Sequence, residues 1–503
     1  MWYMVSYWRV VLSVLFLYSC SHNPQLDVAL ELAGENRLEL EKVLNHYQDS
    51  GLKLDAARFL IANMPGKFGI VAQNNDDKYK KFLENIPQED SVSWRTDSSV
   101  VALKLDSLSK QVIPQRRRVE DITCIRADYL IRHIDAAFKI WKESKYAKHY
   151  SYDDFCHYIL PYRMGQEPLS DWMIVGNERY GHLLDSALSP KEIAVRIALE
   201  EGMRYNIGMG KYPYPQSFEE MMHSRWGTCE EMALYLALAL RSIGIPASID
   251  FVPAWANRSA GHCWNVLKDT CGRFVEVGYG AEGVNSVVYK VSKIYRREYV
   301  RSRKSDVTKE YAMPQMDLTF HLNKEIDDVP VSLCTFNNRD WTPVAFAMPV
   351  GKKVIFPSVG RGALWGENKI LEYQDEGKGL VFLPMKTDDR LPVADPVILY
   401  ENGTQKTLLA DKERTERVVL CRKYPFYVTN SSDIYDSNNV CSGDAYELFY
   451  WDDEWKGLGR KEAETDSLVY ENVPTGALLW LHNYTRGKEE RIFTYENGRQ
   501  IWW

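Results

Sequence analysis

The sequence has no excess of positive charge. Its 62 lysine and arginine residues are outnumbered by 69 aspartate and glutamate residues, which gives a net charge of -7. A protein that binds nucleic acid through the phosphate backbone needs a basic surface. We therefore expect no nucleic-acid partner.

Cysteine is scarce, and metal-binding spacings of cysteine and histidine are lacking. Nine cysteines occur among 503 residues, and none is spaced as a zinc site requires. We expect no metal and no cofactor. Most of these cysteines are predicted to be buried thiols, although Cys263 and Cys271 flank a predicted turn and are candidates for a disulfide.

The sequence also lacks internal repeats and apolar runs long enough to span a bilayer. Without a repeat of about 20 to 50 residues, solenoid and propeller folds are disfavoured. A hydrophobic content of 45% with 26% charged residues indicates a soluble globular protein with a large core. A length of 503 residues favours several domains.

The first 20 residues differ in character from the rest. Arg9 precedes the apolar run Val10–Leu17, which is too short to span a bilayer and predicts a secretory signal peptide. The end of this run, Leu17-Tyr18-Ser19-Cys20, resembles a bacterial lipobox. The resemblance implies lipid attachment at Cys20 and a protein anchored in the bacterial cell envelope, at the outer membrane or cell surface. The alternative is an ordinary signal peptide with an incidental cysteine.

Cys229 is the candidate nucleophile. Thr228 precedes a long apolar run and Glu231 follows three residues later, which is the capping-box pattern of a helix start. Cys229 would then be the first helical residue, where backbone N–H groups and the helix dipole favour a thiolate. The run 232–240 is apolar on every face and predicts a buried central helix. Because Glu230 and Glu231 oppose a neighbouring thiolate, a cationic partner is needed.

A histidine follows on a predicted hairpin. Three runs, at 248–252, 261–267 and 273–277, have the composition of strands, and a polar turn containing Gly272 separates the last two. His262 lies in the second run and is the candidate base. A single cysteine or histidine is more often an inert core residue, but here the helix cap, the helix and the hairpin follow one another in about 50 residues, which favours the catalytic arrangement.

The register of this hairpin decides which acid faces the histidine. If the hairpin is centred on Asp269, Glu276 lies directly opposite His262, and opposed side chains interact. A centre shifted by one residue would instead pair His262 with Gly278. With the first register, a nucleophile, a base and an orienting carboxylate come together as in cysteine acyl transfer.

Three stretches, 225–233, 240–247 and 261–265, resemble the core of the transglutaminase-like superfamily. The resemblance covers about residues 190 to 280. It implies a papain-like fold in which Cys229 is the nucleophile, His262 the general base and Glu276 the acid. The family usually has an aspartate somewhat further past the histidine, so Asp269 is the alternative acid.

The oxyanion of the acyl-transfer intermediate needs hydrogen-bond donors. A nucleophile at a helix start commonly uses its own backbone N–H, here that of Cys229. Gln216 and Trp226 are candidates for a second donor. The alternative is that both residues only pack the loop before the helix.

The expected fold class is α+β. Apolar residues recur at helical spacing from Leu26 to Met64 and again between about Ile122 and Ile207, including a helix over 121–141. After Lys304 short alternating strands follow one another, which is typical of a β-sandwich, and a second β-rich stretch begins near Cys421. The predicted segments are a signal peptide (1–20), a helical N-terminal region (21–120), the transglutaminase-like domain (121–303), a β-sandwich (304–420) and a C-terminal β-rich domain (421–503).

Tryptophans are frequent in the C-terminal third: Trp341, Trp365, Trp451, Trp455, Trp480, Trp502 and Trp503. Exposed indoles stack on sugar rings or peptides, which would suit a binding module. The alternative is that they fill the cores of the sandwiches.

The features together predict a surface-anchored, cysteine-dependent amide-bond hydrolase. Its substrate would be a peptide, a protein or a glycopeptide, and removal of glycans from asparagine is one subclass, because the superfamily includes peptide:N-glycanases. A second hypothesis is a catalytically silent scaffold that binds glycan or peptide for a surface uptake system. A third is an envelope-maturation enzyme acting on peptidoglycan stem peptides.

Overall fold

The computed structural model describes residues 23–73, 77–86, 94–201, 203–277, 289–300, 304–326, 328–364, 373–374, 377–427, 438–486 and 490–503. The chain divides into two compact units. Unit 1 comprises Met1–Ser248, Val266–Val275 and Arg297–Arg303, and unit 2 comprises Ile249–Asn265, Glu276–Arg296 and Lys304–Trp503.

The α-helices in the described ranges all belong to unit 1. They are α2 (Pro24–Leu32), α3 (Arg37–His46), α4 (Leu52–Ala62), α5 (Asp77–Glu84), α6 (Trp94–Gln111), α7 (Ala127–Glu143), α8 (Tyr152–Tyr158), α9 (Trp172–Tyr180), α10 (Pro190–Glu201), α11 (Phe218–Ser224) and α12 (Cys229–Arg241). Helix α7 begins later than the predicted helix over 121–141, because the segment Asp121–Thr123 forms a 3-10 turn. Unit 1 also contains two short strand pairs: β1 (Phe68–Ala72) with β2 (Arg116–Glu120), and β3 (Arg204–Tyr205) with β4 (Trp226–Gly227).

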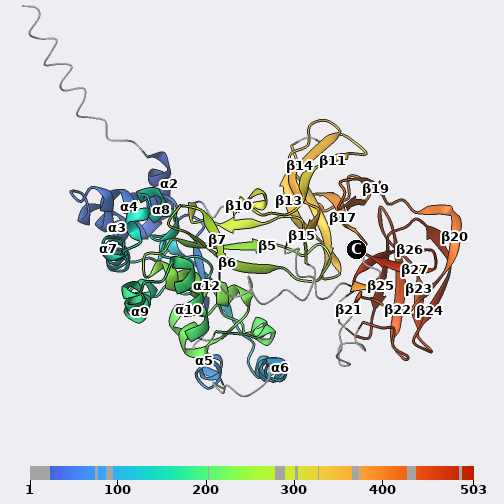
Figure 1. Cartoon of the computed structure of the whole chain (residues 1–503), viewed down its shortest axis with the longest axis horizontal. Coiled ribbons are helices and arrows are strands. Elements are labelled where there is room, and N and C mark those ends of the chain that lie inside the picture. Colours follow the sequence, from blue (N-terminus) through green and yellow to red (C-terminus); the bar gives the residue numbers. More distant parts are fainter. Residues whose placement is uncertain are drawn as a thin grey trace, which may run out of the picture. The chain divides into compact units, whose positions relative to one another are not determined.

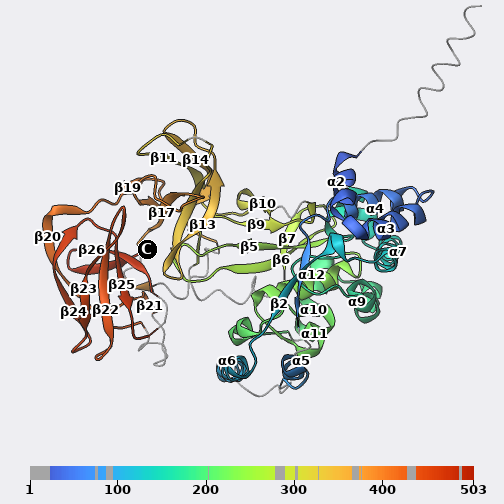
Figure 2. The ribbon, with the colours of Figure 1, turned by 180° about the vertical axis from the view of Figure 1, so that it is seen from behind.

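Helix α12 is the buried helix that the apolar run predicts. It begins at Cys229, and every residue from Met232 to Arg241 is buried. Helices α9, α10 and α11 pack against it (Figure 1 and Figure 2). At its end Arg241 donates from Nε and Nη2 to the backbone oxygen of Ala247, at 2.9 and 2.7 Å. A helix that is apolar on all sides must be enclosed, and the surrounding helices of unit 1 provide this enclosure.

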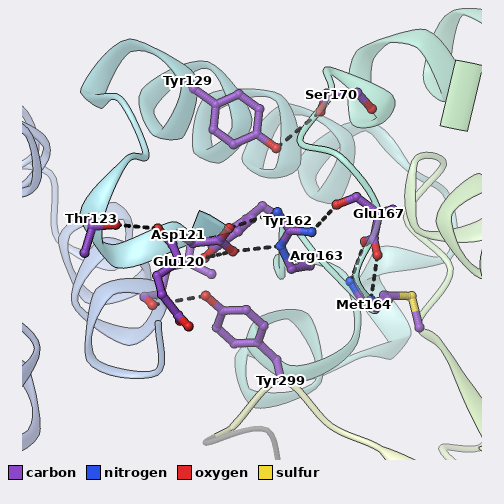
Figure 3. A network of polar contacts seen from close by, with 12 residues as sticks. Glu120, Asp121, Thr123, Tyr129, Tyr162, Arg163, Met164, Glu167, Ser170 and Tyr299 are labelled. Carbon is purple, nitrogen blue, oxygen red and sulfur yellow. Dashed lines mark hydrogen bonds and ion pairs between the residues drawn. The ribbon is translucent and has the colours of Figure 1, made fainter. Parts of the chain in front are cut away.

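A buried ion pair joins the end of β2 to the segment after α8 (Figure 3). Arg163 donates from Nε and Nη2 to the two carboxylate oxygens of Asp121, at 2.7 and 2.9 Å. The Tyr162 hydroxyl donates to the same carboxylate at 3.0 Å. Glu167 accepts two backbone N–H groups of its own turn. Removing one partner of such a pair leaves an uncompensated buried charge, so the network holds this segment in one conformation.

A five-stranded sheet has the strand order β10-β9-β5-β6-β7. Its strands are β5 (Ala247–Val252), β6 (His262–Lys268), β7 (Phe274–Val277), β9 (Tyr295–Arg297) and β10 (Lys304–Asp306). The predicted strand over 248–252 and the predicted hairpin strands are therefore confirmed. His262 is the first residue of β6.

The turn of this hairpin differs from the predicted one. The N–H of Asp269 donates to the backbone oxygen of Arg273 at 2.8 Å, so the turn is centred on Cys271 and not on Asp269. The cause is the Asp269 carboxylate, which accepts the N–H groups of Cys271 and Arg273 at 2.9 Å, together with Gly272 at φ +77°. The prediction that Glu276 lies opposite His262 in register is therefore wrong.

Unit 2 contains a first pair of packed sheets. One has the order β13-β12-β17-β18-β19 and the other pairs β11 with β14. These strands are β11 (Gln315–His321), β12 (Val331–Asn337), β13 (Asp340–Ala347), β14 (Lys353–Gly360), β17 (Gly379–Lys386), β18 (Val397–Tyr400) and β19 (Gln405–Thr407). Apolar side chains from both sheets form one core that includes Phe320, Leu333, Phe356 and Phe382. This face-to-face packing is that of a β-sandwich.

A second pair of sheets follows in the chain. One has the order β23-β22-β25-β26-β27 and the other pairs β20 with β24. These strands are β20 (Asp411–Leu420), β22 (Ala445–Asp452), β23 (Glu454–Glu462), β24 (Leu468–Thr475), β25 (Leu479–Asn483), β26 (Ile492–Glu496) and β27 (Arg499–Trp502). The predicted boundary at 420/421 falls directly after β20, whose partner β24 lies beyond that boundary. Short pairs join β8 (Lys290–Val291) with β15 (Gly362–Ala363), and β16 (Tyr373–Gln374) with β21 (Phe426–Tyr427).

The sheets β13-β12-β17-β18-β19 and β23-β22-β25-β26-β27 share an aromatic core on their other faces. Because side chains alternate along a strand, β17 contributes Phe382 to the sandwich core and its neighbours Val381 and Leu383 to this second core. The tryptophans of this core are Trp341, Trp451 and Trp503, with Trp455 and Trp480 packed against it. Trp341, Trp451, Trp502 and Trp503 are buried, which confirms for these four the alternative that the tryptophans fill the cores. Trp365 lies outside the described residues.

The cysteines of the described ranges form no disulfide. Cys263 is buried within β6 whereas Cys271 is exposed in the turn, so the predicted pairing of these two thiols is wrong. The predicted signal peptide and Cys20 lie outside the described residues. Among the residues that the structure does describe, no helix is both long and apolar enough to cross a membrane.

The aromatic core between the sheets predicts an unequal effect of two phenylalanines on neighbouring strands. Phe336 on β12 is 0% exposed and Phe346 on β13 is 63% exposed. We expect Phe336→Ala to lower the free energy of unfolding by about 3–5 kcal/mol and Phe346→Ala to change it by less than about 0.5 kcal/mol. Urea denaturation followed by tryptophan fluorescence measures both. Equal effects would contradict this assignment of the core.

Candidate active site

Cys229 stands where a strand passes into the central helix. It follows β4, which pairs in parallel with β3, and it is partly exposed. Gly227 is the last residue of β4. A Cβ atom at position 227 would lie 2.9 Å from Cβ of Glu231 in the first turn of α12. A side chain at position 227 would therefore displace Glu231, so glycine is required for this tight approach.

Glu231 closes the predicted capping box at the start of α12, and the reciprocal cap is present. Its Oε2 accepts the Thr228 N–H at 2.8 Å and the Thr228 hydroxyl at 3.2 Å. Burial raises the pKa of the Glu231 carboxyl, and hydrogen bonds from Gln216 and Thr228 oppose that shift. These contacts fix the first turn of α12 and with it the backbone of Cys229.

Gln216, a candidate oxyanion donor, belongs to this cap. It is buried, and its Nε2 donates to the backbone oxygen of Trp226 and to Oε1 of Glu231, both at 3.0 Å. Its Oε1 accepts the Ser224 hydroxyl at 2.7 Å. A side-chain amide group has two N–H hydrogens, and the contacts to Trp226 and Glu231 use both of them. These contacts are those of the packing alternative, and the oxyanion role of Gln216 stays a prediction.

Trp226 is a buried residue of β4. Its indole packs in an apolar cluster with Tyr79, Leu105 and Met209, and the Arg204 guanidinium lies 5.4 Å from the centre of its ring. These contacts are those of a packing residue. An additional role as oxyanion donor stays a prediction.

Glu230, the acid next to Cys229, is held by an ion pair. Arg297 Nη2 lies 2.5 Å from Glu230 Oε1 and 2.6 Å from Oε2. Arg297 therefore offsets the charge of this acid, while the cationic partner of the thiolate stays a prediction. Burial raises the pKa of the Tyr205 hydroxyl, and the charge of Cys229 raises it further.

His262 is bordered by two indole rings within unit 2. Its imidazole stacks with Trp255 at 5.9 Å between ring centres and with Trp264 at 6.0 Å, at interplanar angles of 24° and 29°. Trp255 comes from the loop before β6, and Trp264 is two residues further along the same strand. The orientation of the imidazole therefore depends on where these two indoles are held.

A buried polar network holds Trp264. Its Nε1 donates to the Tyr311 hydroxyl at 2.9 Å, and this hydroxyl donates to Oδ2 of Asp250 at 2.7 Å. Arg296 binds both carboxylate oxygens of Asp250, at 2.8 and 2.9 Å. Burial and Asp250 raise the pKa of Tyr311 far above its ordinary value, and the charge of Glu276 adds to the shift. Sequence reasoning missed this network, although an aspartate inside the apolar run 248–252 signals a buried polar partner.

The predicted triad residues lie in both units. Cys229 belongs to unit 1, and His262 and Glu276 belong to unit 2. The alternative acid, Asp269, is occupied in the turn by a hydrogen bond and an ion pair with Arg273. Within the described ranges, His, Cys, Asp and Glu side chains do not gather in threes as a metal site requires. The triad of Cys229, His262 and Glu276 stays a prediction.

Comparison with known proteins defines the class of this region. Residues 182–278 match the family model described as the transglutaminase-like superfamily. The chain therefore contains a transglutaminase-like core, and this segment includes α12, β5, β6 and β7. No curated protein matches the sequence.

Two solved structures show distant likeness. A candidate protease from Parabacteroides distasonis is 13% identical with a TM-score of 0.20, over 35% of this chain and 30% of its own. The transglutaminase of red sea bream is 9% identical with a TM-score of 0.14, over 85% of this chain and 76% of its own. Neither likeness is close enough to support an inference about activity.

The ion pair beside Cys229 predicts opposite effects of two substitutions. Arg297→Gln leaves the Glu230 charge uncompensated, so we expect the apparent pKa of the Cys229 thiol to rise by roughly half a unit to one unit. Glu230→Gln should lower it by a similar amount, and the double variant should return near the wild-type value. Alkylation rates measured against pH at low ionic strength test this, because salt screens exposed charges.

The matched control is Arg132→Gln, which removes an exposed ion pair with Asp128 on α7. This variant should leave the alkylation profile of Cys229 unchanged. If Arg297→Gln behaved like Arg132→Gln, the assignment of Arg297 as the compensating cation would be incorrect.

Proposed function

We propose that this protein is a cysteine-dependent amide-bond hydrolase, with Cys229 as nucleophile, His262 as general base and Glu276 as the acid that orients the imidazole. The observation that carries the proposal is the placement of Cys229: a partly exposed thiol at the first position of a buried, capped helix. Backbone N–H groups at a helix start stabilise a thiolate. The match of residues 182–278 to the transglutaminase-like superfamily supports the same assignment.

The reaction would proceed through a thioester. The Cys229 thiolate attacks the carbonyl carbon, and the negative charge that forms on the carbonyl oxygen is stabilised by the backbone N–H of Cys229. The C–N bond then breaks, and the leaving amine takes the proton of the His262 imidazolium. In the second half His262 takes a proton from water, the hydroxide attacks the thioester, the C–S bond breaks, and the carboxylic acid leaves with the thiolate restored.

Hydrolysis is favoured over crosslinking because its second substrate is water alone. The proposed substrates are a peptide, a protein or a glycopeptide. Removal of glycans from asparagine is the narrower possibility within this class, since it is also the hydrolysis of a carboxamide.

The competing function is a catalytically silent scaffold whose β-sandwiches bind glycan or peptide. The hairpin register does not place Glu276 opposite His262, so Glu276 is assigned as the acid by family resemblance alone. This favours the scaffold. The burial of most C-terminal tryptophans speaks against the same alternative, since it removes the expected stacking surface.

The thiol of Cys229 distinguishes the two functions. We expect iodoacetamide to label Cys229 ahead of the other thiols at neutral pH, with an apparent pKa well below the free-thiol value of about 8.5. His262→Ala should raise that pKa and lower the hydrolysis of peptides or glycopeptides by about 10²–10⁴-fold, and Cys229→Ala should abolish both labelling and hydrolysis. Mass spectrometry of the labelled peptides identifies the reacting thiol.

The buried thiol of Cys334 is the internal control. Burial raises the pKa of Cys334 to about 12, so this thiol should stay unlabelled in every variant. A normal titration of Cys229 that His262→Ala does not change would refute the hydrolase and favour the scaffold.

We further propose that the protein is anchored in the bacterial cell envelope by a lipid on Cys20. Cys20→Ser should abolish incorporation of a labelled fatty acid and release the protein from the membrane fraction, since acyl chains provide the attachment. Cys124→Ser is the control, because it exchanges an exposed cysteine elsewhere in the chain. Fatty-acid labelling that persists in Cys20→Ser would rule out this site of attachment.

A further inference from the structure

The loop before His262 is held by side chains of the β-sandwiches. This loop, residues 253–261, joins β5 to β6 and belongs to unit 2. Ala254 and Ala256 are 0% exposed and form part of the first sandwich core. The loop is therefore built into that core.

Asn337, the last residue of β12, makes most of the polar contacts to this loop. Its Nδ2 lies 3.1, 2.9 and 2.9 Å from the backbone oxygens of Trp255, Arg258 and Ala260. Its Oδ1 accepts the Ala260 N–H at 2.9 Å. Asn337 is 2% exposed, so these bonds are shielded from water. One buried amide thus fixes both ends of the loop.

Arg491, the residue before β26 in the second pair of sheets, binds the middle of the same loop. This fully buried guanidinium donates to the backbone oxygens of Ala256 and Phe336, and from Nε to that of Trp503 at 2.7 Å. The loop, the end of β12 and the C-terminal residue are thereby joined through one cation. A buried guanidinium satisfied by three carbonyl oxygens is costly to disturb.

The chain turns sharply between these contacts and the histidine. Ala260 has φ +68°, and a Cβ atom on Gly261 would lie 2.5 Å from the backbone oxygen of Val252 and 2.7 Å from that of Pro253. The Trp255 N–H also donates to the Ala260 oxygen at 3.0 Å. A change in the loop therefore passes directly to the start of β6, where the Trp255 indole stacks on the His262 imidazole.

We propose that Asn337 is a positioning residue for the general base: it fixes the loop 253–261, and through the Trp255 indole it sets the orientation of the His262 imidazole. The inference rests on the proposed function, because it assigns a role toward the thiolate–imidazolium pair. It gives the β-sandwiches a part in catalysis as the support of the histidine loop.

The test compares two buried asparagines of unit 2. Asn337→Ala removes the contacts to the loop. Asn483→Ala is the matched control, because Asn483 is also 2% exposed, donates to Asp444 at 3.0 Å and accepts the Thr485 N–H at 2.8 Å. Both variants should lower the melting temperature. Only Asn337→Ala should move the apparent pKa of Cys229 alkylation upward, toward the value of His262→Ala.

A second pair of variants covers the case in which Asn337→Ala does not fold. Trp255→Leu keeps the backbone oxygen that Asn337 binds and removes the stacked ring, and it should raise the apparent pKa of Cys229. Trp255→Phe keeps a ring and should raise it less. The apparent pKa of Cys229 also depends on Glu230, Glu231, Arg297 and the Tyr205 hydroxyl. The substitutions at Asn337 and Trp255 leave these four side chains in place.

The outcomes separate the two proposals. A lowered pKa of Cys229 that rises in His262→Ala, in Asn337→Ala and in Trp255→Leu supports both. The same lowered pKa, raised by His262→Ala but unchanged by Asn337→Ala and Trp255→Leu, overturns the role of Asn337 alone. A normal pKa in the wild type overturns the proposed function and this inference with it.

Discussion

The burial of helix α12 is the constraint on which the transglutaminase-like core depends. A helix with apolar residues on every side gains stability only when other elements enclose it, and the helices of unit 1 do so. Enclosure leaves its first turn as the place where a reactive group reaches solvent. Thr228, Glu231 and Gln216 satisfy the backbone and side-chain polar groups of that turn, which keeps Cys229 at a defined position.

The carboxylates of the two acidic residues that follow Cys229 are compensated in two different ways. Glu231 is partly buried in the cap, where burial raises the pKa of its carboxyl and hydrogen bonds from Gln216 and Thr228 act against that shift. Glu230 is partly exposed and lies against Arg297. An acid next to a thiolate is thus either hydrogen-bonded inside the protein or paired with a cation, which reduces the repulsion that the sequence alone suggests.

Unit 2 supports His262 with buried polar groups on two sides. Tyr311 and Asp250 hold Trp264, while Asn337 and Arg491 hold the loop that carries Trp255. Buried hydrogen bonds of this kind specify one conformation because a broken bond leaves an unsatisfied group in the interior. The C-terminal β-rich sheets are thereby joined to the family core by side-chain chemistry as well as by chain connectivity.

The sequence by itself determined the local elements: the capped helix at Cys229, the strands of the hairpin, the α+β class and the family core. These follow from short-range patterns of apolar spacing and capping, which act between neighbours in the chain. The hairpin register was also decided locally, by the Asp269 carboxylate and Gly272 within the turn. The use of Gln216, the burial of the tryptophans and the support of the histidine loop were decided by tertiary structure, because each depends on contacts between separate elements of the chain, and no local pattern records which of these contacts prevails.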